Sequence, residues 1–153
     1  MPIVPAVSTP KRSSADLTRL ASQLRLAVAR TARTLRREAG EGVTPTLMCA
    51  LTTLEHHGTM TVGALAEHER VTKPTVTRTV HALVDQGLVV RTGDVEDGRV
   101  VWLTLSAEGR RLVQRVRRKK DEYLSRKLGG LDPAEIEALQ RAADILTRIE
   151  GEA

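Results

Sequence analysis

The stretch VTKPTVTRTVHALVDQGLVV, residues 71–90, constrains the fold more than any other part of the chain. Seven of its first ten residues are Thr or Val, which favour β-strands. A strand would place Arg78 on the same buried face as Val76 and Val80. A helix instead gathers Val76, Val80, Leu83 and Val84 into one apolar stripe and leaves the polar side chains on the opposite side. Because the helix separates apolar from polar residues better, we predict a helix.

Local signals support the ends of this helix. Thr72 stands where its side chain can cap the first turn, and Pro74 falls in that turn, where its missing N–H costs little. Gly87 can end the helix with a left-handed backbone. The exposed face then carries short, stiff polar side chains of the kind that fit the major groove of DNA. Taken alone, however, the pattern fits a solvated, Thr-rich surface helix better than a DNA reader.

The remaining periodicity predicts a mainly α-helical chain with one β-hairpin. The hairpin turn is the segment TGDVEDG, which joins two short apolar strands. We predict strands over residues 88–91 and 100–105, and helices over residues 15–38, 45–57, 61–68 and 106–128 and from Pro133 onward.

Composition narrows the class of protein. The chain has 153 residues, one Trp, one Tyr and no Phe, so its core must be aliphatic. A net charge of +5 favours a polyanionic partner such as nucleic acid. Cys49 is the single cysteine, which excludes an intrachain disulfide and favours a reducing compartment. We expect its thiol to be buried and inert.

No apolar run approaches the ~20 residues that span a bilayer, and the N-terminus does not resemble a secretory signal. We therefore predict a cytoplasmic protein that does not associate with membranes. The Pro- and Ser-containing segment 1–13 is predicted to be a disordered tail.

Three segments together resemble the winged-helix core of the multiple-antibiotic-resistance-regulator (MarR) family: TPTLMCALTTL, LAEHERVTKPTVTRTVHALVDQGLVVR and DVEDGRVVWLTLSAEGRRL. The resemblance covers about residues 44–113. It implies a winged helix-turn-helix DNA-binding lobe over residues 44–105. An N-terminal dimerisation helix over residues 14–43 and C-terminal dimerisation helices over residues 106–153 would flank that lobe.

The resemblance also implies site residues. In this family the recognition helix reads bases in the major groove, and the wing motif D-x-x-D-x-R places an arginine in the minor groove. The acidic residues, here Asp94 and Asp97, are expected to hold the wing. The expected DNA contacts are Thr72, Lys73, Pro74, Thr75, Thr77, Arg78 and Arg99, with His81 nearer to phosphate.

The sequence departs from the family pattern in three ways. The near absence of aromatic residues thins the usual lining of the family's effector pocket. Gly98 replaces the basic residue that usually precedes the wing arginine. Glu69 and Arg70 replace a Leu-Gly pair in the turn before the recognition helix. A non-glycine residue with positive φ in that turn would cost about 1 kcal/mol.

The first and last helices carry apolar stripes without an evident partner inside such a core, which favours a homodimer. By resemblance, we expect a repressor that binds a pseudo-palindromic operator and responds to a small phenolic anion, with no cofactor. A basic dimer that coats DNA without sequence preference remains an alternative, as does a winged helix that binds protein.

We expect no enzyme, because the chain lacks a phosphate-binding glycine loop and a nucleophile elbow. We also expect no metal site, because no suitably spaced ligand set appears among His56, His57, His68 and His81.

Overall fold

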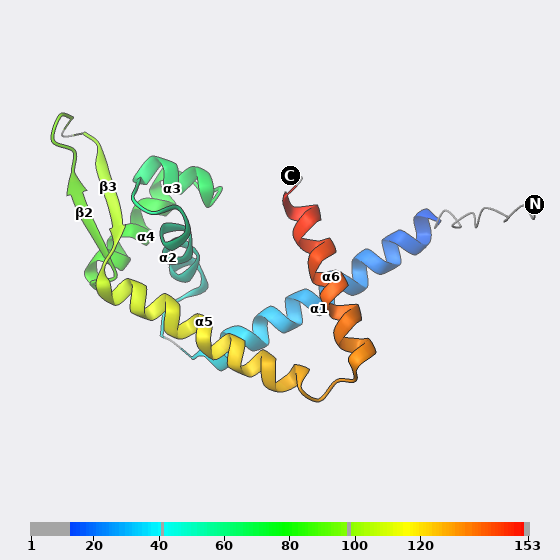
Figure 1. Ribbon diagram of the computed structural model, residues 1–153. Coiled ribbons are helices and arrows are strands. Elements are labelled where there is room, and N and C mark those ends of the chain that lie inside the picture. The colour runs from blue at the N-terminus through cyan, green and yellow to red at the C-terminus, as the bar shows by residue number, and fades with distance from the viewer. Residues whose placement is uncertain (1–12, 41, 98, 152–153) are drawn as a thin grey trace, which may run out of the picture.

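The computed structural model describes residues 13–40, 42–97 and 99–151 (Figure 1). The predicted N-terminal tail, apart from Ser13, and Gly98 lie outside these residues. The order of elements is α1 (Ser14–Ala39), α2 (Pro45–His57), β1 (Met60–Thr61), α3 (Val62–His68), α4 (Lys73–Asp85), β2 (Val89–Gly93), β3 (Val101–Leu105), α5 (Ala107–Leu128) and α6 (Pro133–Gly151). The predicted fold class, mainly α with a small β-hairpin, is confirmed.

A compact lobe forms at one end of the molecule from α2, α3, α4, the strands and the first half of α5 (Figure 1). Its core is aliphatic, as the composition predicts, and its most deeply buried large side chains come from every helix of the lobe except α5 and from β3. These side chains are Leu51, Leu54, Leu65, Val76, Val80, Leu83 and Leu103. Their burial fixes which face of α4 turns outward.

The sheet has three antiparallel strands in the order β1-β3-β2. The predicted hairpin is present, with Val89 opposite Leu105 and Gly93 opposite Val101. The two-residue strand β1, which pairs Met60 with Leu103, was not predicted from the sequence. It pairs with the edge of β3 that does not face β2, so that β3 is the central strand of the sheet.

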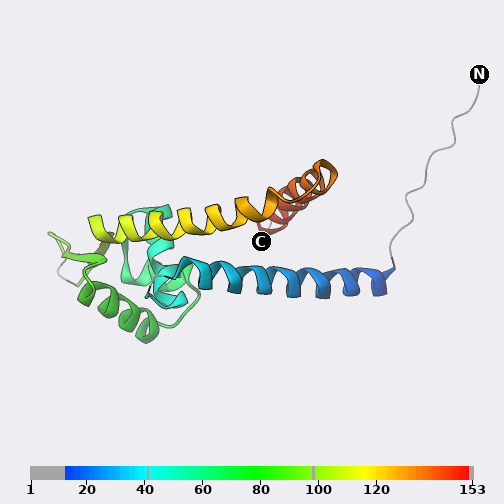
Figure 2. The same ribbon diagram turned by 90° about the horizontal axis from the view of Figure 1, so that it is seen from below.

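The helices outside the lobe are long, and other parts of the chain bury few of their side chains. Figure 2 shows α1 and α5 running side by side, with α6 turning back from the far end of α5. On α1 only Ala39 is buried, and no residue of α6 is buried. The predicted stripe of α6 therefore lies exposed in the single chain: Ile136, Leu139, Leu146 and Ile149 are 38%, 47%, 37% and 59% exposed.

Two turns in the lobe share one hydrogen-bonding pattern. After α4, the N–H of Leu88 donates to the Leu83 carbonyl and that of Gly87 to Val84, with Gly87 at φ 69°. After α3, Val71 donates to Ala66 in the same way. Both are Schellman turns, which need one left-handed residue.

In the turn after α3 the left-handed residue is Arg70, at φ 52°, whose N–H donates to the Glu67 carbonyl. Arg70 is the non-glycine residue with positive φ among the described residues. The expectation of a non-glycine residue with positive φ in this turn is therefore correct, and the turn between α3 and α4 is made by an arginine in a conformation that favours glycine.

Candidate DNA-binding surface

Helix α4 presents a continuous polar face to solvent. Its apolar positions Val76, Val80 and Leu83 point into the core and are at most 1% exposed. Seven of the side chains expected to contact DNA are all exposed on the other side, namely Thr72, Lys73, Pro74, Thr75, Thr77, Arg78 and His81. The burial pattern thus leaves the helix free to enter a groove along its first two turns.

The threonine hydroxyls of α4 already hold internal hydrogen bonds. Thr77 Oγ1 donates to the Lys73 carbonyl at 2.8 Å, and the hydroxyls of Thr72 and Thr75 lie 3.0 Å apart. Thr72 occupies the N-cap position, but its side chain makes no capping hydrogen bond, which differs from the sequence-based expectation. Because the hydroxyl of Thr77 is committed as a donor, this residue offers an approaching base its methyl group and acceptor lone pairs.

The wing is held by hydrogen bonds from its acidic residues. Asp94 Oδ1 accepts from the N–H groups of Glu96 and Asp97 at 2.9 and 3.0 Å. Asp97 Oδ1 accepts from the N–H of Arg99 at 2.9 Å. These bonds curl the turn around the Asp94 carboxylate and leave the Arg99 side chain exposed.

A further contact ties the wing to the sheet. The indole Nε1–H of Trp102, on β3, donates to Asp94 Oδ2 at 2.8 Å. This bond, followed by those from the backbone of Asp97 and Glu96, lowers the pKa of Asp94 below its ordinary value. Sequence reasoning missed Trp102, although a single tryptophan beside an acidic turn was an available signal.

The α4 face and the wing lie at the same end of the molecule, away from α6 (Figure 1). The cationic side chains there, Lys73, Arg78 and Arg99, have no ion-pair partner within the part of the chain that the structure describes. Unpaired cations beside an exposed polar helix can attract phosphate.

A groove separates this lobe from α1. It has a volume of about 730 Å³ and lies between the end of α1, the outer face of α2 and the middle of α5. Cys49 lines it and is exposed, so the expectation of a buried thiol was wrong. The reason is geometric: Cys49 lies on the side of α2 opposite to the buried Leu47, Leu51 and Leu54.

Three histidines meet where α2 and α3 end. The ring centroids of His57 and His68 are 4.2 Å apart, and those of His56 and His57 are 4.8 Å apart. Desolvation, then the charges of His68 and His56, lower the pKa of His57.

Across residues 13–40, 42–97 and 99–151, no three His, Cys, Asp or Glu side chains are placed to hold a metal ion. In the same residues no helix is long and apolar enough to cross a membrane.

Comparison with known proteins shows that this chain is similar to transcriptional regulators. The family model of the MarR family matches residues 43–101. An HTH-type transcriptional regulator of Mycobacterium bovis is 42% identical over 135 residues, which are 88% of this chain and 94% of that protein. The HTH-type transcriptional repressor MdtR of Bacillus subtilis is 36% identical over 69 residues, 45% of this chain and 44% of MdtR. The crystal structure of a transcriptional regulator protein from Pseudomonas aeruginosa, 32% identical, covers 91% of this chain and 98% of its own with a TM-score of 0.80.

Proposed function

The chain belongs to the MarR family of DNA-binding transcriptional regulators, and we propose that it is a homodimeric, ligand-responsive repressor of a pseudo-palindromic operator. The observation that carries the proposal is the α4 surface, where the expected DNA contacts of this helix are exposed, Val76, Val80 and Leu83 are buried and Val84 is half-buried. Repression is supported by the name of the transcriptional repressor MdtR, which is 36% identical to this chain over 69 residues. Occupying a promoter is the simplest way for such a dimer to repress.

In this proposal α4 enters the major groove. Arg78 donates two hydrogen bonds to guanine, and Thr75 and Thr77 present methyl groups to thymine. Lys73 and His81 approach phosphates, while Thr72 and Pro74 set the depth of the first turn. Asp94 and Asp97 hold the wing so that Arg99 reaches the minor groove, where narrow A·T tracts attract arginine.

Dimerisation is supported by the bare stripes of the outer helices. Leu17, Leu24 and Val28 on α1 are 39–53% exposed, and the stripe of α6 is equally open. Pairing these stripes across a two-fold axis buries both and sets two α4 helices about one DNA turn, ~34 Å, apart. A small anion bound in the groove would change that spacing if it binds the two arrangements with different affinities.

Fluorescence anisotropy with duplexes from the region upstream of the gene, against scrambled duplexes across a salt series, tests the DNA-binding proposal. We expect the upstream duplex to bind ~10³-fold or more tightly. Arg78→Ala should lose about 1–3 kcal/mol and relax specificity, and Arg99→Ala should weaken binding with a smaller salt slope. Arg141→Ala on α6 is the control and should bind like wild type. Equal affinity for both duplexes would instead support a non-specific architectural protein.

Sedimentation or light scattering tests the dimer. Leu139→Glu places a charge in the α6 stripe and should shift the protein toward monomer at micromolar concentration. Gln140→Glu adds the same charge one position along the helix and should leave the dimer intact. A Leu139→Glu variant that remains as tightly dimeric as wild type would contradict the assignment of this interface.

A further inference from the structure

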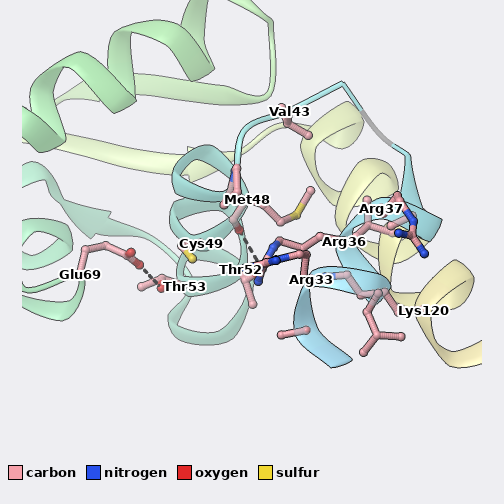
Figure 3. A pocket seen from close by; sticks show the side chains of 15 residues that line it. Arg33, Arg36, Arg37, Val43, Met48, Cys49, Thr52, Thr53, Glu69 and Lys120 are labelled. Atoms are coloured by element: carbon pink, nitrogen blue, oxygen red, sulfur yellow. Dashed lines mark hydrogen bonds between the residues drawn. The ribbon is translucent and has the colours of Figure 1, made fainter. Parts of the chain in front are cut away.

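We propose that the groove between α1, α2 and α5 binds an anionic amphiphile with a flexible aliphatic chain, of the fatty-acid class, rather than a phenolic anion. The inference rests on the proposed function, because it names the effector class of a ligand-responsive regulator. At about 730 Å³ the groove has the size of a small-molecule site. Its lining combines aliphatic side chains with the cations of Arg33, Arg36, Arg37 and Lys120 (Figure 3). One carboxylate, that of Glu69, also lines the groove, and it accepts a hydrogen bond from the Thr53 hydroxyl.

The walls of the groove carry no aromatic ring. Leu35, Val43 and Met48 are half-buried along it, and both aromatic residues of the chain, Trp102 and Tyr123, lie elsewhere. A flat phenolic ligand would therefore find no ring to stack against. A flexible chain suits these walls better, because the unbranched thioether of Met48 can follow an irregular shape.

The cations supply a carboxylate site. Figure 3 shows Arg33 and Arg36 extending from α1 toward Thr52 on α2, with Lys120 of α5 in the same lining. Within the described residues neither guanidinium has an ion pair or hydrogen bond. Neighbouring guanidinium groups repel each other unless an anion lies between them, and their planar forks match a carboxylate.

The position of the groove gives an occupant a means of acting on DNA binding. The arginines belong to α1, whose other end carries the exposed stripe, whereas Met48 and Cys49 belong to α2 in the DNA-binding lobe. A ligand that touches both walls stabilises one separation of α1 and the lobe over others. A polar head on α1 and a chain against α2 would make that contact.

Cys49 allows the site to be tested directly. It is the only cysteine of the chain, is exposed and lines the groove. We would alkylate the reduced full-length protein with N-ethylmaleimide, follow the single adduct by intact mass, and add octanoate, decanoate or dodecanoate below micelle-forming concentrations. Saturating dodecanoate is expected to slow alkylation at least tenfold. Calorimetric Kd values should fall about fourfold for each methylene that becomes buried, or about fifteenfold for each two carbons.

The controls separate head-group from chain recognition. The Arg33→Gln, Arg36→Gln double variant should lose protection by dodecanoate, whereas Arg19→Gln, Arg25→Gln removes equal charge from α1 outside the groove and should keep it. Protection of Cys49 that survives in the groove variant, affinity independent of chain length, or tighter binding of salicylate than of dodecanoate would each overturn the proposal. Because this assay contains no DNA, failure of operator binding and failure of fatty-acid binding remain distinguishable.

Discussion

Substituting Gly109 by alanine should destabilise the protein sharply, although alanine is the better helix former. Gly109 is buried in the first turn of α5. A Cβ atom there would lie 2.1 Å from the backbone oxygen of Leu88 and 3.1 Å from its carbon, whereas real Cβ contacts essentially never fall below 3.0 Å. Helix α5 and the segment before β2 would therefore have to separate by about 0.9 Å, the difference between 3.0 and 2.1 Å.

That separation acts on a small network of hydrogen bonds. The N–H of Ser106 donates to the same Leu88 oxygen at 3.0 Å, and the Ser106 hydroxyl donates to the Gly87 carbonyl at 2.7 Å. The Ser106 hydroxyl also accepts from the N–H of Gly109 at 2.9 Å, which caps α5. Moving α5 away from Leu88 lengthens the two hydrogen bonds from Ser106 that tie the N-terminus of α5 to the segment before β2.

The magnitude follows from three contributions. Overpacking costs about 1–3 kcal/mol, and the upper end applies because a backbone carbonyl cannot rotate away as a side chain can. Weakening the two hydrogen bonds without breaking them adds about 1 kcal/mol in total, and the better helix propensity of alanine returns about 1 kcal/mol. The net loss is about 3 kcal/mol in the free energy of unfolding, or a fall in Tm of roughly 6–12 °C for a chain of this size.

Urea denaturation followed by circular dichroism measures this loss, at equal protein concentration because a dimer's stability depends on concentration. Gly63→Ala is the matched control: it lies in the first turn of α3, and its added Cβ would meet only the Thr61 hydroxyl oxygen, at 3.8 Å. That variant should match or slightly exceed wild type. If Gly109→Ala were as stable as Gly63→Ala, the close approach of α5 to Leu88 would be refuted.

Two further predictions concern the turn before α4 and the wing. Arg70→Gly should stabilise the fold by up to about 1 kcal/mol, whereas Gly87→Ala, in the equivalent turn, should destabilise it by a similar amount; denaturation midpoints that move the opposite way would contradict the strain at Arg70. Because the pKa of Asp94 is lowered in the folded state, its contribution is present above the ordinary value of 3.8 and is lost as pH falls through the folded pKa. Trp102 fluorescence should therefore change below pH 3.8 in wild type, and Asp94→Asn should lack that change; identical pH profiles would disprove the Trp102–Asp94 contact.

The sequence predicts the helices of the lobe well because their apolar residues recur with the period of an α-helix, about 3.6 residues. In α4 the apolar positions repeat at three and four, and that pattern outweighs the strand preference of Thr and Val. The strand β1 was missed because two residues cannot show a period of two. β1 exists because Met60 and Thr61 pair with Leu103 and Trp102 of β3, and the local sequence does not contain that long-range pairing.

Cys49 shows a different kind of error, since the sequence contained the right answer. Residue type alone suggests a buried thiol, because free cysteines are among the most buried residues. The helix containing it buries Leu47, Leu51 and Leu54, and a residue two positions after Leu47 points about 200° away from that stripe. Position on a helix should therefore take precedence over residue type when the two disagree.

The wing shows what local sequence cannot contain. The motif around Asp94 and Asp97 marks a tight acidic turn, but it does not say what the second carboxylate oxygen of Asp94 binds. The partner is Trp102, eight residues away, and only the pairing of Thr92 with Trp102 brings the indole to the base of the turn. The direction of the wing thus depends on the register of β2 and β3, and the turn motif does not determine that register.

Helix α1 links the two proposals physically. Leu17, Leu24 and Val28 form an exposed stripe on α1, and the last turns of the helix carry Arg33 and Arg36, which line the groove. Both sets of residues lie on one continuous α-helix of 26 residues, Ser14–Ala39. A displacement of its C-terminal end by a ligand must therefore also move the stripe that we assign to the dimer interface. If both proposals hold, ligand binding and dimer geometry are coupled through one helix, and a variant that weakens the dimer should also change the affinity for dodecanoate.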